Sequence, residues 1–364
     1  MSDRLRAGIV GAGFIGEVHA RAVVAAGGIV AAVAASTPAR AATAAERLRA
    51  ERAATRAEEL LAADDIDVVH ICTPNHLHVA LAGQAIAAGK HVVCEKPLAT
   101  NVEDARRLAR AAADADVVTA VPFVYRFYPT VREARARVQH DGAASLRLLH
   151  GSYLQDWLAN AADNNWRVDA ALGGASRAFG DIGVHWCDLI EFTTGHRITR
   201  LCARTTTVHA QRACGARRVA VHTEDAAIVL FETDHGALGS VVISQVCPGR
   251  KNRLWFSLDG ADSSLSFDQE LPDSLRIGTR RETTVLARGT ETLAPAAQRY
   301  SVVPAGHPQG FQDCFNAFVA DAYAAIAGDL SDGLPTFADG YRAALITAAV
   351  LDSADRQAWV EVSA

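Results

Sequence analysis

Lysine, methionine and aromatic residues are all scarce in this sequence of 364 residues. Only three of its 36 basic residues are lysines, Met1 is the single methionine, and aromatic residues make up 6%. Alanine and valine supply much of the apolar half of the chain. This bias reflects codon usage more than function. It also means that a general abundance of lysine cannot explain where the three lysines stand, at positions 90, 96 and 251.

An excess of positive charge is also lacking, and this excludes one class of partner. The formal net charge is −5, whereas proteins that bind nucleic acids typically carry a basic stripe, so we expect no nucleic-acid partner. The seven cysteines are odd in number and form no C-x-x-C pair. Cys72 and Cys94 lie in apolar runs, which indicates reduced, buried thiols in a cytoplasmic protein. Neither the cysteines nor the histidines show zinc-ligand spacing, so we expect no metal.

A membrane segment is the third absence. The start of the chain lacks the apolar core of a signal peptide. Residues 22–39 carry no charge and are long enough to suggest a spanning helix. Gly27 and Gly28 interrupt this stretch, however, and Pro38 follows Ser36 and Thr37 near its end. We predict a helix, a turn and a buried strand there, and no membrane association.

Valine-rich runs alternate with alanine-rich helical patterns in the first third of the chain. Continuously apolar strands are buried on both faces, so this pattern predicts a parallel sheet covered by helices on each side. Right-handed crossovers make this a doubly wound α/β domain, which we place at residues 1–122. The predicted strands are 6–10, 28–35, 67–72, 90–95 and 116–121, and helices are predicted at 37–51, 76–89 and 101–115.

The pattern changes after residue 122. Alternating apolar and polar residues predict antiparallel strands, with turns at Thr233–Gly236 and Gly260, and two helical patterns follow late in the chain. We therefore place a second, α+β domain at residues 123–364 and interpret the polar segment 279–300 as a surface loop. The predicted strands are 145–155, 226–233, 237–246 and 253–260, and the late helices are 311–328 and 337–354.

A glycine pattern joins the first predicted strand to the next helix. In Gly11-Ala12-Gly13-Phe14-Ile15-Gly16, the first glycine permits a tight turn, the second lets the backbone approach a pyrophosphate, and the third permits close packing of helix on sheet. The helix N-terminus offers unpaired N–H groups and positive dipole to phosphates. In its strand–turn–helix context, this pattern predicts a dinucleotide site.

The end of the second strand bears on the choice of dinucleotide. An acid there binds a ribose 2′-hydroxyl, whereas an arginine accommodates a 2′-phosphate. This chain has Ser36, Thr37 and Arg40 and no acid. We therefore expect NADP or NAD, with NADP slightly favoured. Arg40 as a solvated helix residue is the alternative.

Two further motifs end predicted strands of the first domain. Glu95 and Lys96 stand before a proline, where Lys96 could polarise a substrate oxygen, because the pKa of a lysine shifts readily on desolvation. A surface ion pair is the alternative for this dipeptide. Thr73, Asn75 and His78 follow the preceding strand at the same edge of the sheet, where ligands bind in open α/β sheets. Asn75 could instead cap the next helix.

A glycine-rich segment of the second domain precedes Asp181 and His185. These two residues share a face if the segment is helical. Histidine is the best general base near neutral pH, and a nearby carboxylate can tune it. A helix cap for Asp181 and a core position for His185 are the alternatives.

These motifs together resemble the Gfo/Idh/MocA oxidoreductases, the superfamily of glucose-fructose oxidoreductase and inositol dehydrogenase. The resemblance lies in the order of GIVGAGFIG, DDIDVVHICTPNHLHVALAGQAIAAGKHVVCEKPLA and GGASRAFGDIGVHWCDL, and it covers essentially the whole chain. It implies a Rossmann domain followed by an α+β domain with a large, mostly antiparallel open sheet that often makes oligomer contacts. A homodimer or homotetramer is therefore expected, with a sugar, polyol or derivative as substrate.

The resemblance also implies residue roles. The catalytic set would be Lys96, Asp181 and His185. Substrate contacts are expected on the weaker similarity of one segment to the levoglucosan dehydrogenase-like branch, namely Tyr153, Gln155, Asp156 and Trp157. The motifs and the resemblance together give the expected cofactor contacts, namely Gly11, Gly13, Phe14, Ile15, Gly16, Ser36, Thr37, Arg40, Thr73, Asn75, His78, Glu95, Lys96, Arg126, Trp166 and Arg167.

One departure and two alternatives accompany this interpretation. Val124 replaces the asparagine of the family's F-N-Y-R element, so any hydrogen bond that this asparagine makes is in doubt. The expected activity is hydride transfer between a sugar carbinol carbon and the nicotinamide. A glycosidase of the same superfamily that uses the cofactor transiently is one alternative. A non-catalytic dinucleotide sensor is the other.

Overall fold

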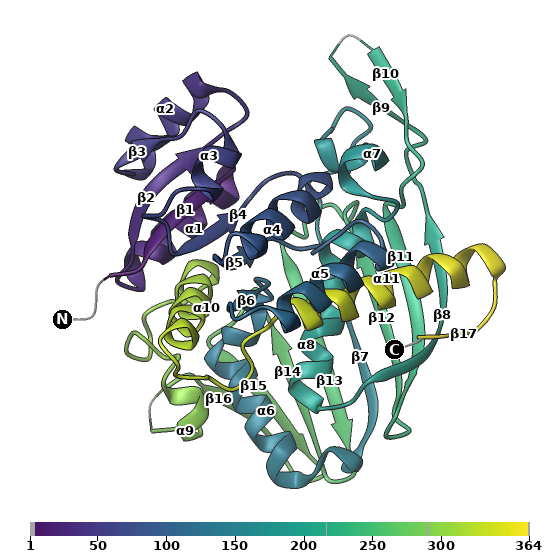
Figure 1. Cartoon of the computed structure of the whole chain (residues 1–364). Coiled ribbons are helices and arrows are strands. Elements are labelled where there is room, and N and C mark those ends of the chain that lie inside the picture. The colour runs from purple at the N-terminus through teal and green to yellow at the C-terminus, as the bar shows by residue number, and fades with distance from the viewer. Residues whose placement is uncertain (1–3, 216, 290, 363–364) are drawn as a thin grey trace. The chain divides into compact units, whose positions relative to one another are not determined.

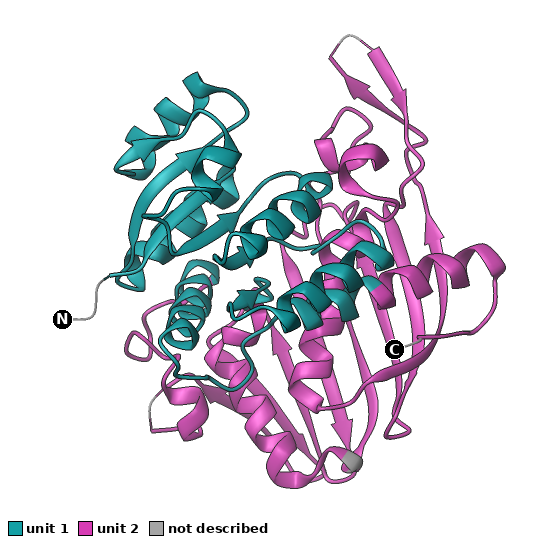
Figure 2. Ribbon diagram, in the orientation of Figure 1, with its two compact units in different colours: residues 1–124, 311–344 teal, residues 125–310, 345–364 magenta. Residues whose placement is uncertain are grey.

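The computed structural model describes residues 4–215, 217–289 and 291–362. The chain forms two compact units (Figure 2). Unit 1 consists of Met1–Val124 and Phe311–Ala344, and unit 2 of Tyr125–Gly310 and Leu345–Ala364. The last helix, α11 (Phe337–Arg356), therefore begins in one unit and ends in the other.

Unit 1 contains a six-stranded sheet in the order β3-β2-β1-β4-β5-β6, and all its strand pairs are parallel (Figure 1). The four central strands are almost wholly buried, which explains their continuously apolar sequences. The predicted doubly wound parallel sheet is confirmed. Its strands are β1 (Arg6–Val10), β2 (Ile29–Ala34), β3 (Arg52–Ala53), β4 (Val68–Ile71), β5 (His91–Cys94) and β6 (Thr119–Ala120).

Two helices of unit 1, α2 and α5, begin at a capping side chain. The Thr37 hydroxyl accepts a hydrogen bond from the Arg40 N–H ahead of α2, and Asn101 does the same for Asp104 ahead of α5. Helix α10 (Phe311–Ile326) comes late in the chain but packs on α1. The other helices are α1 (Phe14–Ala25), α2 (Pro38–Leu48), α3 (Ala57–Leu61), the short 3₁₀ turn η1 (Asn75–Leu77), α4 (His78–Ala87) and α5 (Val102–Asp114).

Unit 2 is built on a nine-stranded sheet in the order β16-β15-β14-β13-β7-β12-β11-β8-β17, in which only the β7–β12 pair is parallel. The predicted large, mostly antiparallel sheet is confirmed. Its strands are β7 (Leu146–Leu154), β8 (Ile198–Thr206), β11 (Ala226–Thr233), β12 (Leu238–Ser244), β13 (Arg253–Gly260), β14 (Ser263–Asp268), β15 (Ser274–Thr279), β16 (Thr283–Ala287) and β17 (Val360–Glu361).

Side chains on the two faces of this sheet differ in exposure. Along β11, Ala227, Val229 and Phe231 are buried, whereas Ile228 and Leu230 are about half exposed. The buried face carries α6 (Pro129–Asp141) and α8 (Val184–Thr194), and α8 contacts β7 while α6 contacts β14 and β15. A separate hairpin consists of β9 (Gln211–Cys214) and β10 (Arg217–Ala220).

The predicted surface loop at 279–300 is wrong in part. Strand β16 pairs with β15, and α9 (Pro295–Gln298) follows; Thr290 lies outside the described residues. Strand β16 is an edge strand with mostly exposed side chains, so main-chain pairing forms it without the apolar alternation that reveals half-buried strands. The turn at Thr233–Gly236 is confirmed, because the Gly236 N–H donates to the Thr233 carbonyl. No described helix is long and apolar enough to cross a membrane.

Candidate active site

The glycine loop between β1 and α1 has the geometry of a phosphate cradle. Gly11 has φ of +110°, and a Cβ there would lie 2.4 Å from the Cys72 carbonyl oxygen. A Cβ at Gly16 would lie 2.2 Å from the Gly11 carbonyl oxygen, whereas a Cβ at Gly13 would meet nothing within 4 Å. Two glycines are thus required by the fold, and Gly13 leaves open space at the start of a twelve-residue helix.

Phe14 and Ile15 begin α1 directly beside this open space. Phe14 is 74% exposed, which is unusual for so large an apolar side chain. The Gly13 cap makes no side-chain hydrogen bond, so the first N–H groups of α1 remain available to an anion. The residues present therefore fit the diphosphate of a dinucleotide.

The end of β2 holds the three residues that we associated with dinucleotide choice. The Arg40 guanidinium donates to the Ser36 hydroxyl at 3.1 Å, and the Arg40 N–H donates to the Thr37 hydroxyl at 3.2 Å. Ser36, Thr37 and Arg40 thus cluster at the N-terminus of α2. Such a cluster can bind a phosphate, because hydroxyls, a guanidinium and a helix N-terminus all favour an anion.

The carboxyl ends of β4 and β5 bring together the next set of predicted residues. His78 is fully buried, with its ring nitrogens 2.8 Å from the Pro97 carbonyl and 3.0 Å from the Thr73 carbonyl. It therefore ties the segment after β4 to the segment after β5. Asn75 is buried in the turn that precedes α4, and Pro74, not Asn75, occupies the cap position there.

Glu95 is buried beside Lys96 and is held as an anion. Its Oε2 accepts the Lys96 N–H at 3.1 Å, and its Oε1 lies 3.2 Å from His19 Nε2. Burial by itself raises the pKa of this carboxyl. The hydrogen bond and the electrostatic interaction with His19, together with the charge of Lys96, outweigh burial and hold the pKa of Glu95 below its usual value.

Asp181 and His185 lie in unit 2, on consecutive helical segments. Asp181 belongs to a π-helical turn (η5, Phe179–Gly183) that continues into α8, where His185 is in the first turn. The alternative of Asp181 as a helix cap is therefore wrong. π-Helical turns are frequent at functional sites, since they re-aim side chains within a helix.

Two neighbours hold the Asp181 carboxylate. Arg167 Nε lies 3.3 Å from Oδ1, and Gln245 Nε2 donates to Oδ2 at 2.9 Å. The Gln245 amide is fully buried, and its own oxygen accepts from Arg177 Nη1 at 3.2 Å. Because a guanidinium has no acceptor, it fixes the orientation of the amide so that its NH₂ faces Asp181.

An aromatic and amide network surrounds His185. Its ring contacts Tyr125 edge-on, with centroids 5.0 Å apart, and Tyr153 at 6.4 Å. The two tyrosine hydroxyls share a hydrogen bond, and Tyr153 also donates to Asn252 Oδ1 at 2.8 Å. Burial, and then the neighbouring Tyr125, raise the pKa of Tyr153, so it stays protonated.

The other predicted substrate residues extend this network. Gln155 donates to Asn252 Oδ1 at 2.7 Å and accepts from the Trp157 indole N–H at 2.7 Å. Asp156 points elsewhere: its Oδ2 accepts from Lys251 Nζ at 2.6 Å and from the Gly249 N–H at 3.1 Å. Tyr153, Gln155 and Trp157 thus share one network with Asn252, and Asp156 belongs to a neighbouring turn.

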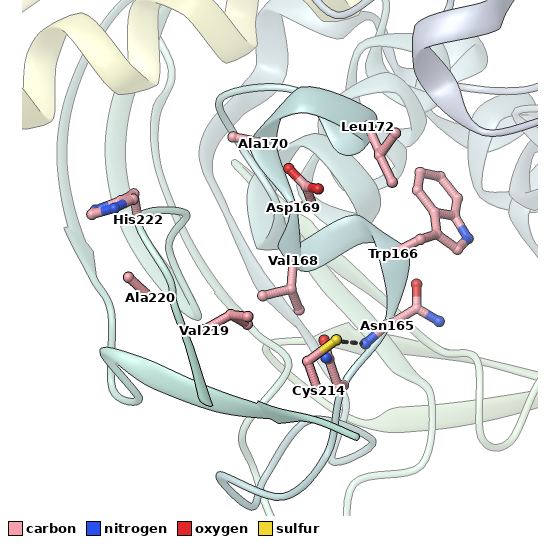
Figure 3. Close-up of a pocket in the computed structure, with 11 residues that line it drawn as sticks. Asn165, Trp166, Val168, Asp169, Ala170, Leu172, Cys214, Val219, Ala220 and His222 are labelled. Carbon is pink, nitrogen blue, oxygen red and sulfur yellow. Dashed lines mark hydrogen bonds between the residues drawn. The ribbon is translucent and has the colours of Figure 1, made fainter. Parts of the chain in front are cut away.

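A pocket of about 590 Å³ lies elsewhere in unit 2, between residues 164–172 and the β9–β10 hairpin (Figure 3). Trp166 and Asn165 line it on one side, and Val219 and His222 on the other. Neither Asp181 nor His185 lines this pocket, so we do not place the chemistry in it. Trp166 also stacks under the Arg167 guanidinium, 4.4 Å from it.

Arg126 and Val124 are both buried. The Arg126 guanidinium forms a two-pronged ion pair with Asp188, including Nε to Oδ2 at 2.8 Å. This pairing anchors the start of unit 2 to α8, and contact of Arg126 with a cofactor stays a prediction. Val124 is 1% exposed and supplies no hydrogen-bonding side chain.

Comparisons with known proteins show the family to which the chain belongs. Residues 5–123 match the model of the oxidoreductase family with an NAD-binding Rossmann fold, and residues 131–266 match the Gfo/Idh/MocA C-terminal domain. The chain belongs to the Gfo/Idh/MocA oxidoreductase family. It is therefore an oxidoreductase with an NAD-binding Rossmann fold.

Several relatives are similar over nearly their full length. Levoglucosan dehydrogenase of Pseudarthrobacter phenanthrenivorans is 32% identical, over 99% of this chain and 98% of that protein. A structure of levoglucosan dehydrogenase in complex with NADH and levoglucosan has a TM-score of 0.93 at 30% identity and covers 99% of this chain and all of that one. An inositol dehydrogenase homologue with NAD⁺ from Azotobacter vinelandii has a TM-score of 0.87 at 27% identity and covers 99% and 98%.

The structure adds residues to the site of this family member that sequence reasoning missed. Gln245 and Asn252 contact predicted site residues, yet they stand 64 and 97 positions away from Asp181 and Gln155. No local motif surrounds either residue, so only the folded sheet reveals them. Among the described residues, no cluster of three or more histidine, cysteine, aspartate or glutamate side chains could hold a metal ion.

Proposed function

We propose that the protein is a dehydrogenase that moves a hydride between a carbinol carbon of a sugar or polyol and a nicotinamide. The observation that carries this proposal is that this family member has both a dinucleotide cradle and a pair of candidate acid–base residues. Unit 1 has a glycine cradle with Lys96 at the same sheet edge, and unit 2 has Asp181 and His185 fixed by buried partners. Relatives named for levoglucosan and inositol dehydrogenation support the substrate class.

In the proposed mechanism, His185 removes the proton from the reacting hydroxyl of the sugar. Its edge-on packing against Tyr125 fixes the plane of the ring, so the base is pre-oriented. Asp181 orients the sugar by accepting a neighbouring hydroxyl, and Lys96 stabilises the developing alkoxide with its ammonium charge. The nicotinamide, when bound, accepts or returns the hydride.

The further cofactor and substrate contacts are proposed as expected from the sequence. The dinucleotide lies along Gly11, Gly13 and the start of α1, with Glu95 near its nicotinamide half. Tyr153, Gln155 and Trp157 contact the sugar through the network around Asn252. Support comes from the placement of these groups at strand ends and beside His185.

We also propose that the cofactor is NADP or NAD, with NADP slightly favoured. The support is the cluster of Ser36, Thr37 and Arg40, and the lack of an acid at the end of β2. An Arg40→Ala variant should then lose about tenfold or more in kcat/KM with NADP⁺ and little with NAD⁺, because it removes one charge-assisted phosphate contact. An equal effect on both cofactors would refute the preference.

One experiment tests the main proposal. Absorbance of the reduced nicotinamide is followed with a panel of sugars, anhydrosugars and inositols, with NAD⁺ and NADP⁺ in parallel. Turnover of at least one carbinol supports the proposal. Glycoside cleavage without net cofactor reduction would instead indicate the glycosidase, and cofactor binding without any turnover would indicate a sensor.

Variants of the catalytic set sharpen this test. Lys96→Ala and His185→Ala should keep cofactor affinity and lose about 10²–10⁴-fold in kcat, the usual contribution of a positioned acid–base group. Lys90→Ala is the matched lysine control, since the Lys90 ammonium donates to the Ala63 carbonyl in unit 1 and is not among the predicted site residues. Wild-type turnover in either catalytic variant would refute the assignment.

We further propose that the protein is a cytoplasmic homodimer or homotetramer whose first domain ends near residue 122, apart from the late segment 311–344 that belongs to unit 1. The open face of the unit 2 sheet exposes five apolar side chains, which supports self-association: Leu148, Ile228, Leu230, Leu238 and Val242. Burial raises the pKa of the Cys72, Cys94 and Cys314 thiols and keeps them neutral, as suits a reducing compartment. The molar mass in solution, measured by light scattering, tests this assembly, and the mass of a single chain would contradict it.

A further inference from the structure

Four buried polar side chains form a continuous hydrogen-bonded chain inside unit 1. The Tyr323 hydroxyl on α10 lies 3.0 Å from His70 Nε2 on β4, and His70 Nδ1 lies 2.8 Å from His19 Nδ1 on α1. His19 Nε2 in turn lies 3.2 Å from Glu95 Oε1. Both imidazoles are fully buried, and Tyr323 is 6% exposed. Neither the cofactor cradle nor the catalytic set uses His19, His70 or Tyr323.

The donors in this chain can be ordered with both imidazoles neutral. An ionised Glu95 only accepts, so His19 Nε2 carries a proton and His19 Nδ1 has a lone pair. His70 Nδ1 must then be the donor to His19, which leaves His70 Nε2 as an acceptor. Only the Tyr323 hydroxyl can supply that proton. Tyr323 therefore donates to His70, His70 donates to His19, and His19 donates to Glu95.

The packing around the chain holds this geometry. Phe315, also on α10, contacts the His19 ring at a centroid distance of 4.7 Å, and the His19 and His70 rings meet edge-on at 5.1 Å. One helix thus supplies both the terminal donor and the side chain that fixes His19. Figure 2 shows α10 among the elements of unit 1, although it follows residue 310.

Other titratable groups lie near Glu95 and Tyr323, the two ends of the hydrogen-bonded series. Lys96 and His78 act on the Glu95 charge, and the neutral thiols of Cys72 and Cys94 lie close enough to feel it. At the other end, burial and then Asp67 raise the pKa of Tyr323, which keeps its hydroxyl protonated. Burial likewise lowers the pKa of His70, which keeps it neutral.

We propose that Tyr323 is a positioning residue that, through His70 and His19, holds the Glu95 carboxylate ionised and in place beside Lys96. This inference rests on the proposed function in one respect, namely that Glu95 faces the nicotinamide half of the cofactor. Without the Tyr323 hydroxyl, His70 can adopt either tautomer. If it reverses, His19 reverses with it, and Glu95 must take up a proton to keep its hydrogen bond.

A spectroscopic test needs no turnover. Nitrogen-15 spectra of histidine-labelled protein, assigned with His19→Gln and His70→Gln, report which ring nitrogen carries the proton in each neutral imidazole. We expect the Nε2–H form for His19 and the Nδ1–H form for His70 at mildly alkaline pH. A His70 ring with its proton on Nε2 would overturn the proposal, whatever the outcome of the sugar screen.

A functional test uses Tyr323→Phe, which removes the hydroxyl and keeps the ring. The acid limb of kcat/KM, and of NADH affinity measured by fluorescence, should move upward by about one pH unit, which is about a tenfold loss on the acid side. Values at alkaline pH should match the wild type. Glu95→Gln should abolish this limb, because it leaves no carboxyl to titrate.

A control separates positioning from general loosening of unit 1. Phe318→Leu shortens another buried side chain of α10 and contributes no atom to the hydrogen-bonded chain. Any loss of kcat/KM or of NADH affinity in Phe318→Leu should be the same at every pH value. A pH-independent loss in Tyr323→Phe that matches this control would overturn the proposal. If no sugar is turned over, the pH dependence of NADH affinity still tests the role of Tyr323. A failure of the Tyr323 proposal can therefore be distinguished from a failure of the proposed dehydrogenase function.

Discussion

Replacement of Gln245 is the sharpest perturbation of the unit 2 site, because this residue contacts Asp181 and not the expected base. Its buried amide donates to Asp181 at 2.9 Å and accepts from Arg177 at 3.2 Å. A hydrogen bond to a charged group contributes about 1.5–3 kcal/mol. If that contribution orients Asp181 in the transition state, Gln245→Leu should lower kcat/KM by about one to two orders of magnitude.

Gln245→Glu separates the two contacts of the amide. A glutamate still accepts from Arg177, so the fold should retain most of its stability, but it sets a second carboxyl against Asp181. Two carboxyls at hydrogen-bond distance share a proton, and the pKa of one rises. The loss in kcat/KM should therefore be larger at alkaline than at acidic pH, where the shared proton restores a hydrogen bond.

The assay is sugar-dependent reduction of the nicotinamide across a pH series, with urea unfolding to measure stability. Gln309→Leu is a matched control, since Gln309 is a buried glutamine of the same unit that bonds main-chain groups of Tyr300 and Val302. It should affect stability and leave the pH profile unchanged. Wild-type kcat/KM in a folded Gln245→Leu protein would refute the positioning of Asp181 by this amide.

Three other substitutions have effects that follow from single contacts. Gly11→Ala forces a Cβ against the Cys72 carbonyl at a positive φ, and should cost about 1–3 kcal/mol in urea unfolding and weaken NADH binding; unchanged binding would count against the cradle. Asp225→Ala leaves two buried guanidinium groups without their shared carboxylate and should cost about 3–5 kcal/mol, and a loss under 1 kcal/mol would contradict the ion-pair geometry. Burial depresses the folded-state pKa of His70, so its stabilising contribution is present above the unfolded pKa of about 6.5 and is lost as the pH falls below it, at up to about 1.4 kcal/mol per pH unit. His70→Gln should flatten the acid side of the stability curve, and an equally steep slope would disprove this.

Much of the fold was predictable because the signals are local. Apolar runs such as residues 67–72 and 90–95 predict fully buried strands, and the glycine loop after β1 predicts its own turn from steric limits on Gly11. Strand β16 escaped prediction, because its exposed side chains carry no burial pattern. The π-helical turn at Phe179–Gly183 also escaped, since helical periodicity does not distinguish it from an α-helix.

The order of elements and the glycine loop followed from the sequence, because each depends on residues that are neighbours in the chain. The same local motifs led to the proposal that Lys96, Asp181 and His185 are the reactive side chains. Tertiary structure alone decided which partners hold them. Tyr323 reaches His70 across 253 positions, and Gln245 reaches Asp181 across 64. Such contacts depend on how helices and strands pack, and the free energy of packing is distributed over many side chains with no local motif of its own.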